Sequence, residues 1–557
     1  MKTAIKSAAE PAPIPGNQAR ASTNDALRPP FSREKAVLWV ALAAIAGLTV
    51  LSARQIDVDL RALGGGFDDV ANLLARMLPP ELDDPPRVGE LLVETLMMAL
   101  LGTVLATFIS IPLAFLAASN TTPHPAVHHA ARMIITMCRA IPDLVFAVLF
   151  VRALGIGVLP GILALGLHSV GMMAKLFADA IEQIDEGPRE AVRATGAGRL
   201  AELVSAVLPQ VTPAWIGTFI YRVDINLRTS VVLGFVGAGG IGFALQDALR
   251  GLMYQSAMGI ILIILLIIAA MEYLASGLRR TLLDPASDGA ALPAMPGPSL
   301  RPPWTKGRTI RGLCAAATVT AVVVSVIYLN IDPLAPIKQF PDLVSVFGRL
   351  MPPSVEGVQN ALLKAVGETL AIGLVATAAG AAAAIPVGIL AARNVSPSVY
   401  TYHSARAVIL AVRAIPELIL AVIFVAAIGL GPMAGAMALG VGTIGFLGKL
   451  VADSVEEIPG GPLEAVRAAG GSWWDVLFAA VIPQTLPQLT GHWLYMLDVN
   501  IRTSTVLGIV GAGGIGFLLM ESVRTLNFDI AGSIILIIFF IVFAIERLSA
   551  WIRRLFR

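Results

Sequence analysis

Long apolar stretches alternate with short polar segments along the whole chain. The apolar stretches near 36–53, 90–118, 128–153, 158–182, 203–233 and 256–278 approach or exceed the length of about 20 residues that a helix needs to cross a bilayer. A second set lies near 310–329, 358–391, 404–429, 433–455, 477–507 and 530–551. This pattern predicts an all-α polytopic membrane protein with about six transmembrane helices in each set.

The second set of helices repeats the first at a constant offset. Arg139-Ala140-Ile141-Pro142 recurs as Arg413-Ala414-Ile415-Pro416, and 413 minus 139 is 274. Between 222–243 and 496–517, 16 of 22 positions are identical. We therefore predict a tandem duplication with repeats at 36–280 (core 90–280) and 310–557 (core 360–550). An even number of spans gives both repeats the same orientation, as in parallel-repeat transporters.

Composition narrows the class of protein further. Hydrophobic residues make up 56% of the chain and charged residues 14%, whereas soluble domains carry about 25% charged residues. The net charge of +2 gives no support to a nucleic-acid partner. The two cysteines exclude a disulfide framework. The chain has no Gly-x4-Gly-Lys-Ser/Thr phosphate loop, so we predict that any ATPase is a separate protein.

The distribution of basic residues predicts the topology. Arg279, Arg280, Arg553 and Arg554 flank helix ends that an arrangement with both termini inside would place in the cytoplasm. Residues 1–35 are then a cytoplasmic tail, and the Pro-, Ala-, Gly- and Ser-rich stretch 281–309 is a cytoplasmic linker.

Two amphipathic segments, 67–80 and 340–353, predict short helices after the first span of each repeat. They could lie on the outer membrane interface or pack against the other spans, and the sequence leaves both open.

A short polar segment between the fourth and fifth spans keeps its spacing in both repeats. In the first, Glu190-Ala191-Val192 is followed by three residues, Gly196, nine residues and Ala206-Val207-Leu208-Pro209. A generic surface helix has no reason to keep this spacing twice. The segment resembles the cytoplasmic coupling motif of ATP-binding-cassette importer permeases, although Val192 and Ala206 replace the usual Ala and Ile. The resemblance implies that a set of residues in both copies couples to the ATPase: Glu190, Ala191, Gly196, Glu464, Ala465 and Gly470.

Each fifth span ends in a glycine-rich segment. The first contains Gly237, Gly239, Gly240 and Gly242, and the second contains Gly511, Gly513, Gly514 and Gly516. The spacing matches a dinucleotide fingerprint, but that fingerprint requires a preceding strand, and here apolar spans flank it. Since glycine permits backbone mobility and close approach, we predict an outer gate.

A polar block precedes each glycine segment and predicts the translocation path. Its members are Asp224, Asn226, Arg228, Thr229 and Ser230, with copies at Asp498, Asn500, Arg502, Thr503 and Ser504. Two interpretations are compatible: Asp224 and Arg228 form an i, i+4 pair, or the two arginines converge on the pseudo-axis in the outer part of the membrane and guide an anion. Nearer the inner interface, Arg139 and Asp143 are predicted to pair in the same way.

This block, Asn-x-Arg-Thr-Ser-x-Val-Leu-Gly-x-Val-Gly-Ala-Gly-Gly-Ile-Gly, resembles the permeases of phosphonate importers in particular. The resemblance implies a type I ABC importer permease fold in a bacterial inner membrane. It also implies two cytoplasmic ATPase subunits that hold ATP and Mg, and an extracytoplasmic phosphonate-type binding protein. The chain itself is expected to bind lipid but no cofactor or metal. Phosphonates, phosphite and phosphate esters all remain open as the transported oxyanion.

Two other classes of function are weaker. A secondary carrier would need intramembrane acidic residues for ion coupling, and an intramembrane enzyme would need a nucleophile or metal constellation, which does not occur at the expected spacing.

Overall fold

The computed structural model describes residues 33–58, 60–283, 306–332 and 334–555, so most of the predicted tail and most of the predicted linker lie outside it. The described residues up to Leu51 and the segment Ser52–Arg557 form separate compact units. Helices make up the first half in this order: α2 (Arg33–Gln55), α3 (Leu60–Arg76), α4 (Pro85–Ala117), α5 (Pro125–Ala140), α6 (Asp143–Leu154), α7 (Val158–Glu182), α8 (Gly187–Ala194), α9 (Arg199–Glu202), η1 (Leu203–Val207), α10 (Leu208–Gly234), α11 (Ile241–Arg250) and α12 (Tyr254–Leu283).

The second half repeats this order from α13 onward. Its helices are α13 (Lys306–Tyr328), α14 (Ala335–Lys338), α15 (Phe340–Arg349), α16 (Gln359–Leu390), α17 (Val399–Ala414), α18 (Glu417–Ile428), α19 (Pro432–Glu456), α20 (Gly460–Ala468), α21 (Trp473–Val476), η3 (Leu477–Val481), α22 (Ile482–Leu507), η4 (Gly508–Val510), α23 (Ile515–Arg524) and α24 (Phe528–Leu555). Among the described residues, eight helices are long and apolar enough to cross a membrane, and three bent pairs raise the number to eleven. The predicted all-α polytopic fold with a tandem repeat is confirmed.

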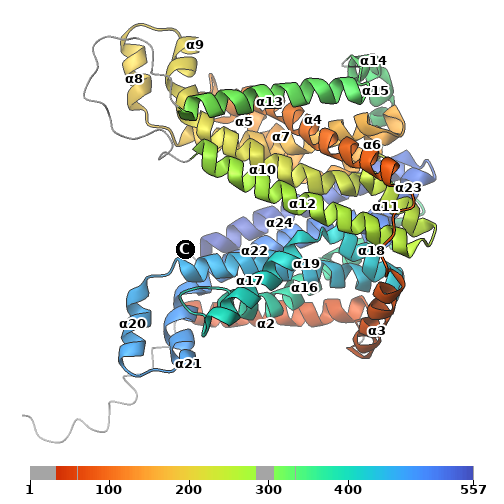
Figure 1. Cartoon of the computed structure of the whole chain (residues 1–557), viewed down its shortest axis with the longest axis vertical. Coiled ribbons are helices and arrows are strands. Elements are labelled where there is room, and N and C mark those ends of the chain that lie inside the picture. The colour runs from red at the N-terminus through yellow and green to blue at the C-terminus, as the bar shows by residue number, and fades with distance from the viewer. Residues whose placement is uncertain (1–32, 59, 284–305, 333, 556–557) are drawn as a thin grey trace, which may run out of the picture. The chain divides into compact units, whose positions relative to one another are not determined.

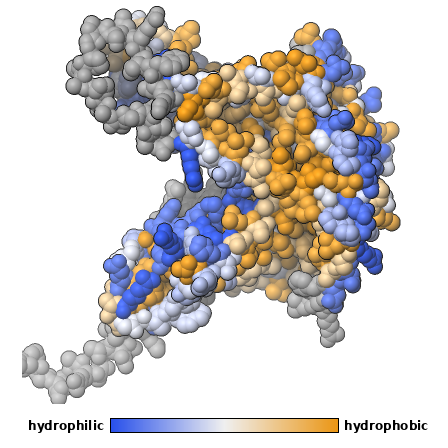
Figure 2. Space-filling view, viewed as in Figure 1, coloured by the Kyte–Doolittle hydropathy of each residue, from blue (hydrophilic) through white to orange (hydrophobic). Residues whose placement is uncertain are grey.

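The long helices of the larger unit run side by side (Figure 1). The short helices α8 and α20 extend from the same end, whereas α11, α15 and α23 lie at the opposite end. Figure 2 shows apolar side chains gathered in a band between these ends, as expected for a bilayer-embedded surface. The same view is hollowed between the two halves at the α8 and α20 end, where hydrophilic residues are visible.

The third predicted span of each half is broken rather than straight, which corrects the sequence prediction. α5 and α6 meet at an angle of 84°, and α17 and α18 meet at 82°. Proline causes the break, because it disfavours helical geometry in the preceding residue and cannot donate a backbone hydrogen bond. Accordingly, Ile141 before Pro142 and Ile415 before Pro416 are extended, with ψ of 122° and 119°.

The two predicted amphipathic helices are present as α3 and α15, and each contacts the opposite half. α3 contacts α18, and α15 contacts α6. Leu73 and Met77 are buried in one apolar cluster with Leu418, while Val346 lies in a second cluster with Leu144. The structure therefore supports the packing interpretation for one face of these helices, and this packing ties the halves together.

Candidate functional site

The six predicted coupling residues lie on α8, on α20 and directly after them, all at one end of the larger unit (Figure 1). All of them are exposed: Glu190, Ala191, Gly196, Glu464, Ala465 and Gly470. The two glycines adopt φ of +77° and +81°, which residues with a β-carbon rarely adopt. Their amides donate to Arg193 and Arg467 carbonyls at 2.9 and 3.0 Å, so each glycine ends its short helix in a left-handed turn.

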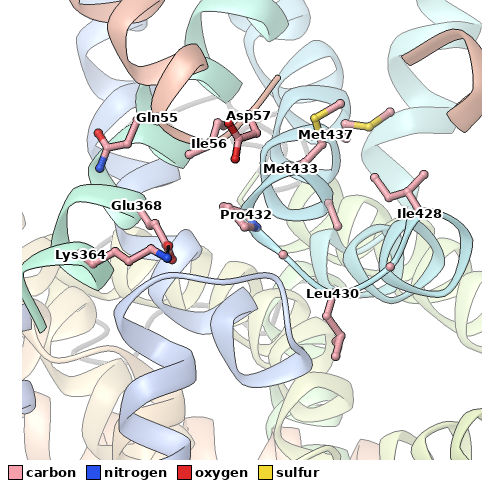
Figure 3. Close-up of a pocket in the computed structure, with 13 residues that line it drawn as sticks. Gln55, Ile56, Asp57, Lys364, Glu368, Ile428, Leu430, Pro432, Met433 and Met437 are labelled. Carbon is pink, nitrogen blue, oxygen red and sulfur yellow. Dashed lines mark ion pairs between the residues drawn. The ribbon is translucent and has the colours of Figure 1, made fainter. Parts of the chain in front are cut away.

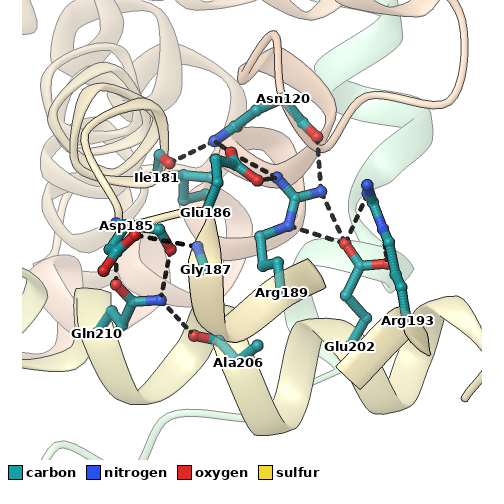
Figure 4. A network of polar contacts seen from close by, with 10 residues as sticks. All are labelled: Asn120, Ile181, Asp185, Glu186, Gly187, Arg189, Arg193, Glu202, Ala206 and Gln210. Carbon is teal, nitrogen blue, oxygen red and sulfur yellow. Dashed lines mark hydrogen bonds and ion pairs between the residues drawn. The ribbon is translucent and has the colours of Figure 1, made fainter. Parts of the chain in front are cut away.

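Different interactions hold α8 and α20 in place. In the first half, the buried guanidinium of Arg189 donates to Glu202 at 2.8 Å, to Glu186 at 2.7 Å and to the Asn120 carbonyl at 2.9 Å (Figure 4). At the equivalent positions of the second half, buried Leu463 and Val476 pack in an apolar cluster. Ion pairs in the first half thus correspond to apolar contacts in the second half.

Glu202 also accepts two hydrogen bonds from Arg193, both at 2.9 Å. These hydrogen bonds raise the pKa of the Arg193 guanidinium above its already high usual value. The arginine therefore stays charged at any physiological pH, and two arginines from α8 share one carboxylate that precedes α10.

The predicted pairs in the polar block are present in both halves. Arg228 lies 3.5 Å from Asp224, and Arg502 lies 3.3 Å from Asp498. The arginine side chains are only 22% and 23% exposed, and the Nε atom of each is buried without a hydrogen-bond partner among the described residues. The Nε–H donor of each guanidinium is therefore unused.

The same two arginines also reach across to the opposite half. Arg228 Nη1 donates to the Arg413 carbonyl at 3.3 Å, and Arg502 Nη1 donates to the Arg139 carbonyl at 3.1 Å. These carbonyls belong to the last turns of α17 and α5, where a positive charge interacts favourably with the helix dipole. The arginines thus contact the broken segment of the partner half.

The guanidiniums of Arg139 and Arg413 cross between the halves as well. Arg139 is bonded to Glu546 on α24, and Arg413 lies 3.8 Å from Glu272 on α12. Glu272 also lies 3.4 Å from Arg228. The predicted pairing of Arg139 with Asp143 is wrong, because the break at Pro142 places Asp143 on a different helix and removes the i, i+4 geometry.

The remaining members of the polar block pack within their own half. Fully buried Asn226 donates to Thr103 at 2.8 Å and accepts from Ser169 at 3.1 Å. Asn500 donates to Thr377 and Thr443, both at 2.9 Å. Ser230 and Ser504 are buried, and their hydroxyls donate to backbone carbonyls. Thr229 and Thr503 directly follow the two arginines in the sequence and are half-buried. The asparagines therefore fasten α10 and α22 to their neighbours.

Each glycine segment forms a sharp loop that a carboxylate and a hydroxyl hold in place. Three glycines per loop have positive φ: Gly237, Gly239, Gly240, Gly511, Gly513 and Gly514. The Gly240 amide donates to Glu94 at 3.3 Å, and the next amide, of Ile241, donates to Thr95 at 2.8 Å. Gly242 and Gly516 lie inside α11 and α23, where a side chain would collide with the Val231 or Thr505 carbonyl.

The second loop interrupts a longer helical path rather than ending it. The helical segment Trp473–Val510 and α23 meet at 42° at this loop and are together long and apolar enough for one broken span. Arg502 is therefore followed by the rest of α22, the loop and all of α23. This places the arginine further from the outer end than the sequence predicted, since that prediction ended the span at the glycines.

A cavity of about 350 Å³ lies beside one residue that holds the second glycine loop (Figure 3). Its lining includes Glu368, whose carboxylate lies 3.9 Å from Lys364 and accepts from the Gly514 amide at 3.1 Å. The carboxylate that holds the loop is thus next to open space. Sequence reasoning noted the repeated Glu94 and Glu368 only as markers of the duplication, and gave no role to Glu272 and Glu546.

Comparison with known proteins identifies the family of this chain. A family model described as the binding-protein-dependent transport system inner membrane component matches residues 110–285 and 384–557. The chain is 61% identical over 91% of its length to the phosphate-import permease protein PhnE of Mycolicibacterium smegmatis, of which it covers 92%.

Shorter relatives match one half at a time. The phosphite transport system permease protein PtxC of Stutzerimonas stutzeri is 42% identical over 43% of this chain and 87% of its own length. The putative phosphite transport system permease protein HtxC of the same organism is 37% identical over 42% of this chain and 84% of its own length. The family model matches once in each half, over ranges that contain the polar block and the glycine segment of that half, and the chain therefore belongs to the binding-protein-dependent transport system inner membrane components.

Proposed function

We propose that this chain forms the whole translocation path of an ATP-driven importer for phosphate, phosphonates or related small oxyanions. The permease function follows from the family, and relatives named as phosphate-import and phosphite transport permeases support the substrate class. The observation that carries the proposal is the pair of arginines, Arg228 and Arg502, at equivalent positions of α10 and α22. An arginine fork matches the oxygens of a phosphate-like anion.

The partners are part of the same proposal. Two cytoplasmic ATPase subunits would bind ATP and Mg and receive α8 and α20, whose exposed residues lie at the same end of the molecule. An extracytoplasmic binding protein would deliver the anion at the opposite end, beside α11 and α23. In this arrangement both chain termini are cytoplasmic, in an inner membrane.

Transport would then follow alternating access. Closure of the ATPases pushes α8 and α20, and the halves rock about the pseudo-axis. The contacts of Arg228 and Arg502 with the opposite half would change during this motion, because each bond joins two different halves. Their unused Nε donors would become available to the anion.

The test is uptake of inorganic phosphate, phosphite and methylphosphonate by proteoliposomes that contain the assembled complex. We expect Arg228→Ala and Arg502→Ala each to lower uptake by about tenfold or more, since a hydrogen bond to a charged group contributes about 1.5–3 kcal/mol. Lysine at either position should restore part of it, because the charge remains without the fork. Normal uptake in both alanine variants, at normal ATPase association, would contradict the anion role.

A further inference from the structure

Two cavities meet at the outer ends of the two halves. Their volumes are about 540 and 440 Å³, and they share Phe235, Gln246, Arg250 and Arg524. Gly237 of the first glycine loop lines the larger cavity, and Gly511 of the second loop lines the smaller one. We call the two cavities together the outer cleft. Both glycine loops therefore face a space that contains arginines from both halves.

The two shared arginines are not needed to cap the C-terminal ends of the helices that carry them. Arg250 and Arg524 are the last residues of α11 and α23, where a basic side chain often caps the final carbonyls. Here backbone amides do so: Gly251 donates to Asp247 and Thr525 donates to Glu521, both at 2.9 Å. Both guanidiniums are exposed and have no ion-pair or hydrogen-bond partner within the part of the chain that the structure describes.

A third arginine makes the cleft asymmetric. Arg152 of α6 lines the larger cavity, and its Nη2 donates to the Val523 carbonyl of the opposite half at 2.8 Å. The equivalent position in the second half is Ala426, which lines the smaller cavity. The cavity beside the first glycine loop thus has three arginines, and the other has two.

No acidic residue lines either cavity. Asp247 and Glu521 precede the arginines by one turn on α11 and α23, but neither belongs to the lining. A cleft with charge of one sign and apolar walls concentrates counter-ions. Guanidinium groups bind tetrahedral oxyanions through paired N–H donors.

We propose that the outer cleft is a first binding site for a tetrahedral oxyanion, which rests there after leaving the binding protein and before the glycine loops open. The site lies mainly on the Arg152 side. This inference rests on the proposed oxyanion import and adds a separate site outside the gate, distinct from Arg228 and Arg502. The arginines could instead attract an acidic surface of the binding protein. Their convergence on one hollow beside both loops, with no carboxylate in its lining, favours the small anion.

The experiment uses the complete complex in proteoliposomes, with its ATPase and binding protein, and inorganic phosphate as the probe. The variants are Arg250→Gln combined with Arg524→Gln, and Arg152→Gln alone. We expect phosphate transported per ATP hydrolysed to fall about tenfold in the double variant and several-fold in the single one. The binding-protein concentration that half-saturates ATPase stimulation should stay the same. Arg349→Gln, on α15 at the same end but outside the cleft, is the matched control and should change neither quantity.

Two results would overturn the inference. If the half-saturating concentration rises while phosphate per ATP stays constant, the arginines dock the binding protein. If neither quantity changes, the cleft has no role. Lysine in place of glutamine in both test variants keeps the charge, and these lysine variants should transport phosphate at an intermediate level. This result separates anion binding from a folding defect. A wild-type complex that moves no phosphate, phosphite or methylphosphonate would instead contradict the proposed function itself.

Discussion

Arg189 of α8 and Leu463 of α20 occupy equivalent positions, yet different interactions bury them. The buried charge of Arg189 is paired with Glu202, whose side chain is 7% exposed, whereas Leu463 packs against the apolar residues of its cluster. Burying a charge is costly unless a partner and hydrogen bonds compensate. Loss of one partner should therefore affect the two halves unequally.

We expect Glu202→Ala to loosen α8 selectively. The change leaves buried Arg189 without its main carboxylate partner, and an unsatisfied buried polar group costs about 1–3 kcal/mol. Hydrogen exchange of amides in 186–205 should accelerate by roughly tenfold or more, while amides in 460–479 stay protected. The matched variant is Val476→Ala, at the equivalent position of the second half, which should show the reverse pattern. Equal acceleration in both segments after Glu202→Ala would contradict the prediction that the ion pairs of Arg189 stabilise α8 independently of α20.

Short helices lie between the membrane spans, and two of them, α8 and α20, end at a glycine with positive φ. We expect Gly196→Val and Gly470→Val to impair uptake strongly, because a β-branched residue at φ near +80° is strained by roughly 1–3 kcal/mol. Association of the ATPase should weaken in a pull-down of the assembled complex. Gly198→Val is the control, since its φ of −71° and ψ of 165° suit valine and open space surrounds the position. Normal uptake with normal ATPase association in both test variants would remove the coupling assignment.

Sequence identified those elements that depend on local pattern. Apolar length predicts the spans, and repeated spacing predicts α8 and α20. The breaks at Pro142 and Pro416 cannot be predicted in this way, since their apolar flanks look like one continuous span and proline also occurs inside α4 and α10. The short helices α11 and α23 cannot be predicted for a related reason: a glycine-rich segment looks like the end of a span.

Contacts between the halves could not be predicted from the sequence. Nothing in the spacing of Arg139 indicates that its partner is Glu546, because the two residues are 407 positions apart. An i, i+4 pair with Asp143 was the only local choice. One signal was available: Glu272 and Glu546 are repeated at the common offset, as are Arg139 and Arg413. Repeated charges in apolar segments therefore deserve to be matched across repeats as well as within them.

At the scale of the whole molecule, the two ionic contacts Arg139–Glu546 and Arg413–Glu272 hold the halves in the observed arrangement. Their side chains are 25–34% exposed, so each contact contributes at most about 1 kcal/mol. We expect Glu272→Gln combined with Glu546→Gln to shift the population of conformations by roughly five- to thirty-fold. Pulsed electron paramagnetic resonance between labels at Ala194 and Ala468, in a chain without Cys138 and Cys314, would measure the change in separation.

Contacts within one half provide the control for that experiment. Lys175 pairs with Asp179, and Lys449 pairs with Asp453 at the equivalent position. Replacing both lysines with alanine removes two ion pairs without touching the boundary between the halves. An altered label separation in this control, or an unaltered one in the glutamine variant, would show that the inter-half contacts do not set the arrangement.

Joining both halves in one polypeptide has an evolutionary consequence. In a transporter assembled from two identical chains, each substitution appears twice, so an arginine at one gate must also appear at the other. Here a single substitution can give Arg152 to the cavity beside one glycine loop and leave Ala426 beside the other, or give ion pairs to α8 and leucine to α20. Covalent fusion also makes both versions in equal number and in the same molecule, so the two sides are free to specialise without any risk of mispairing.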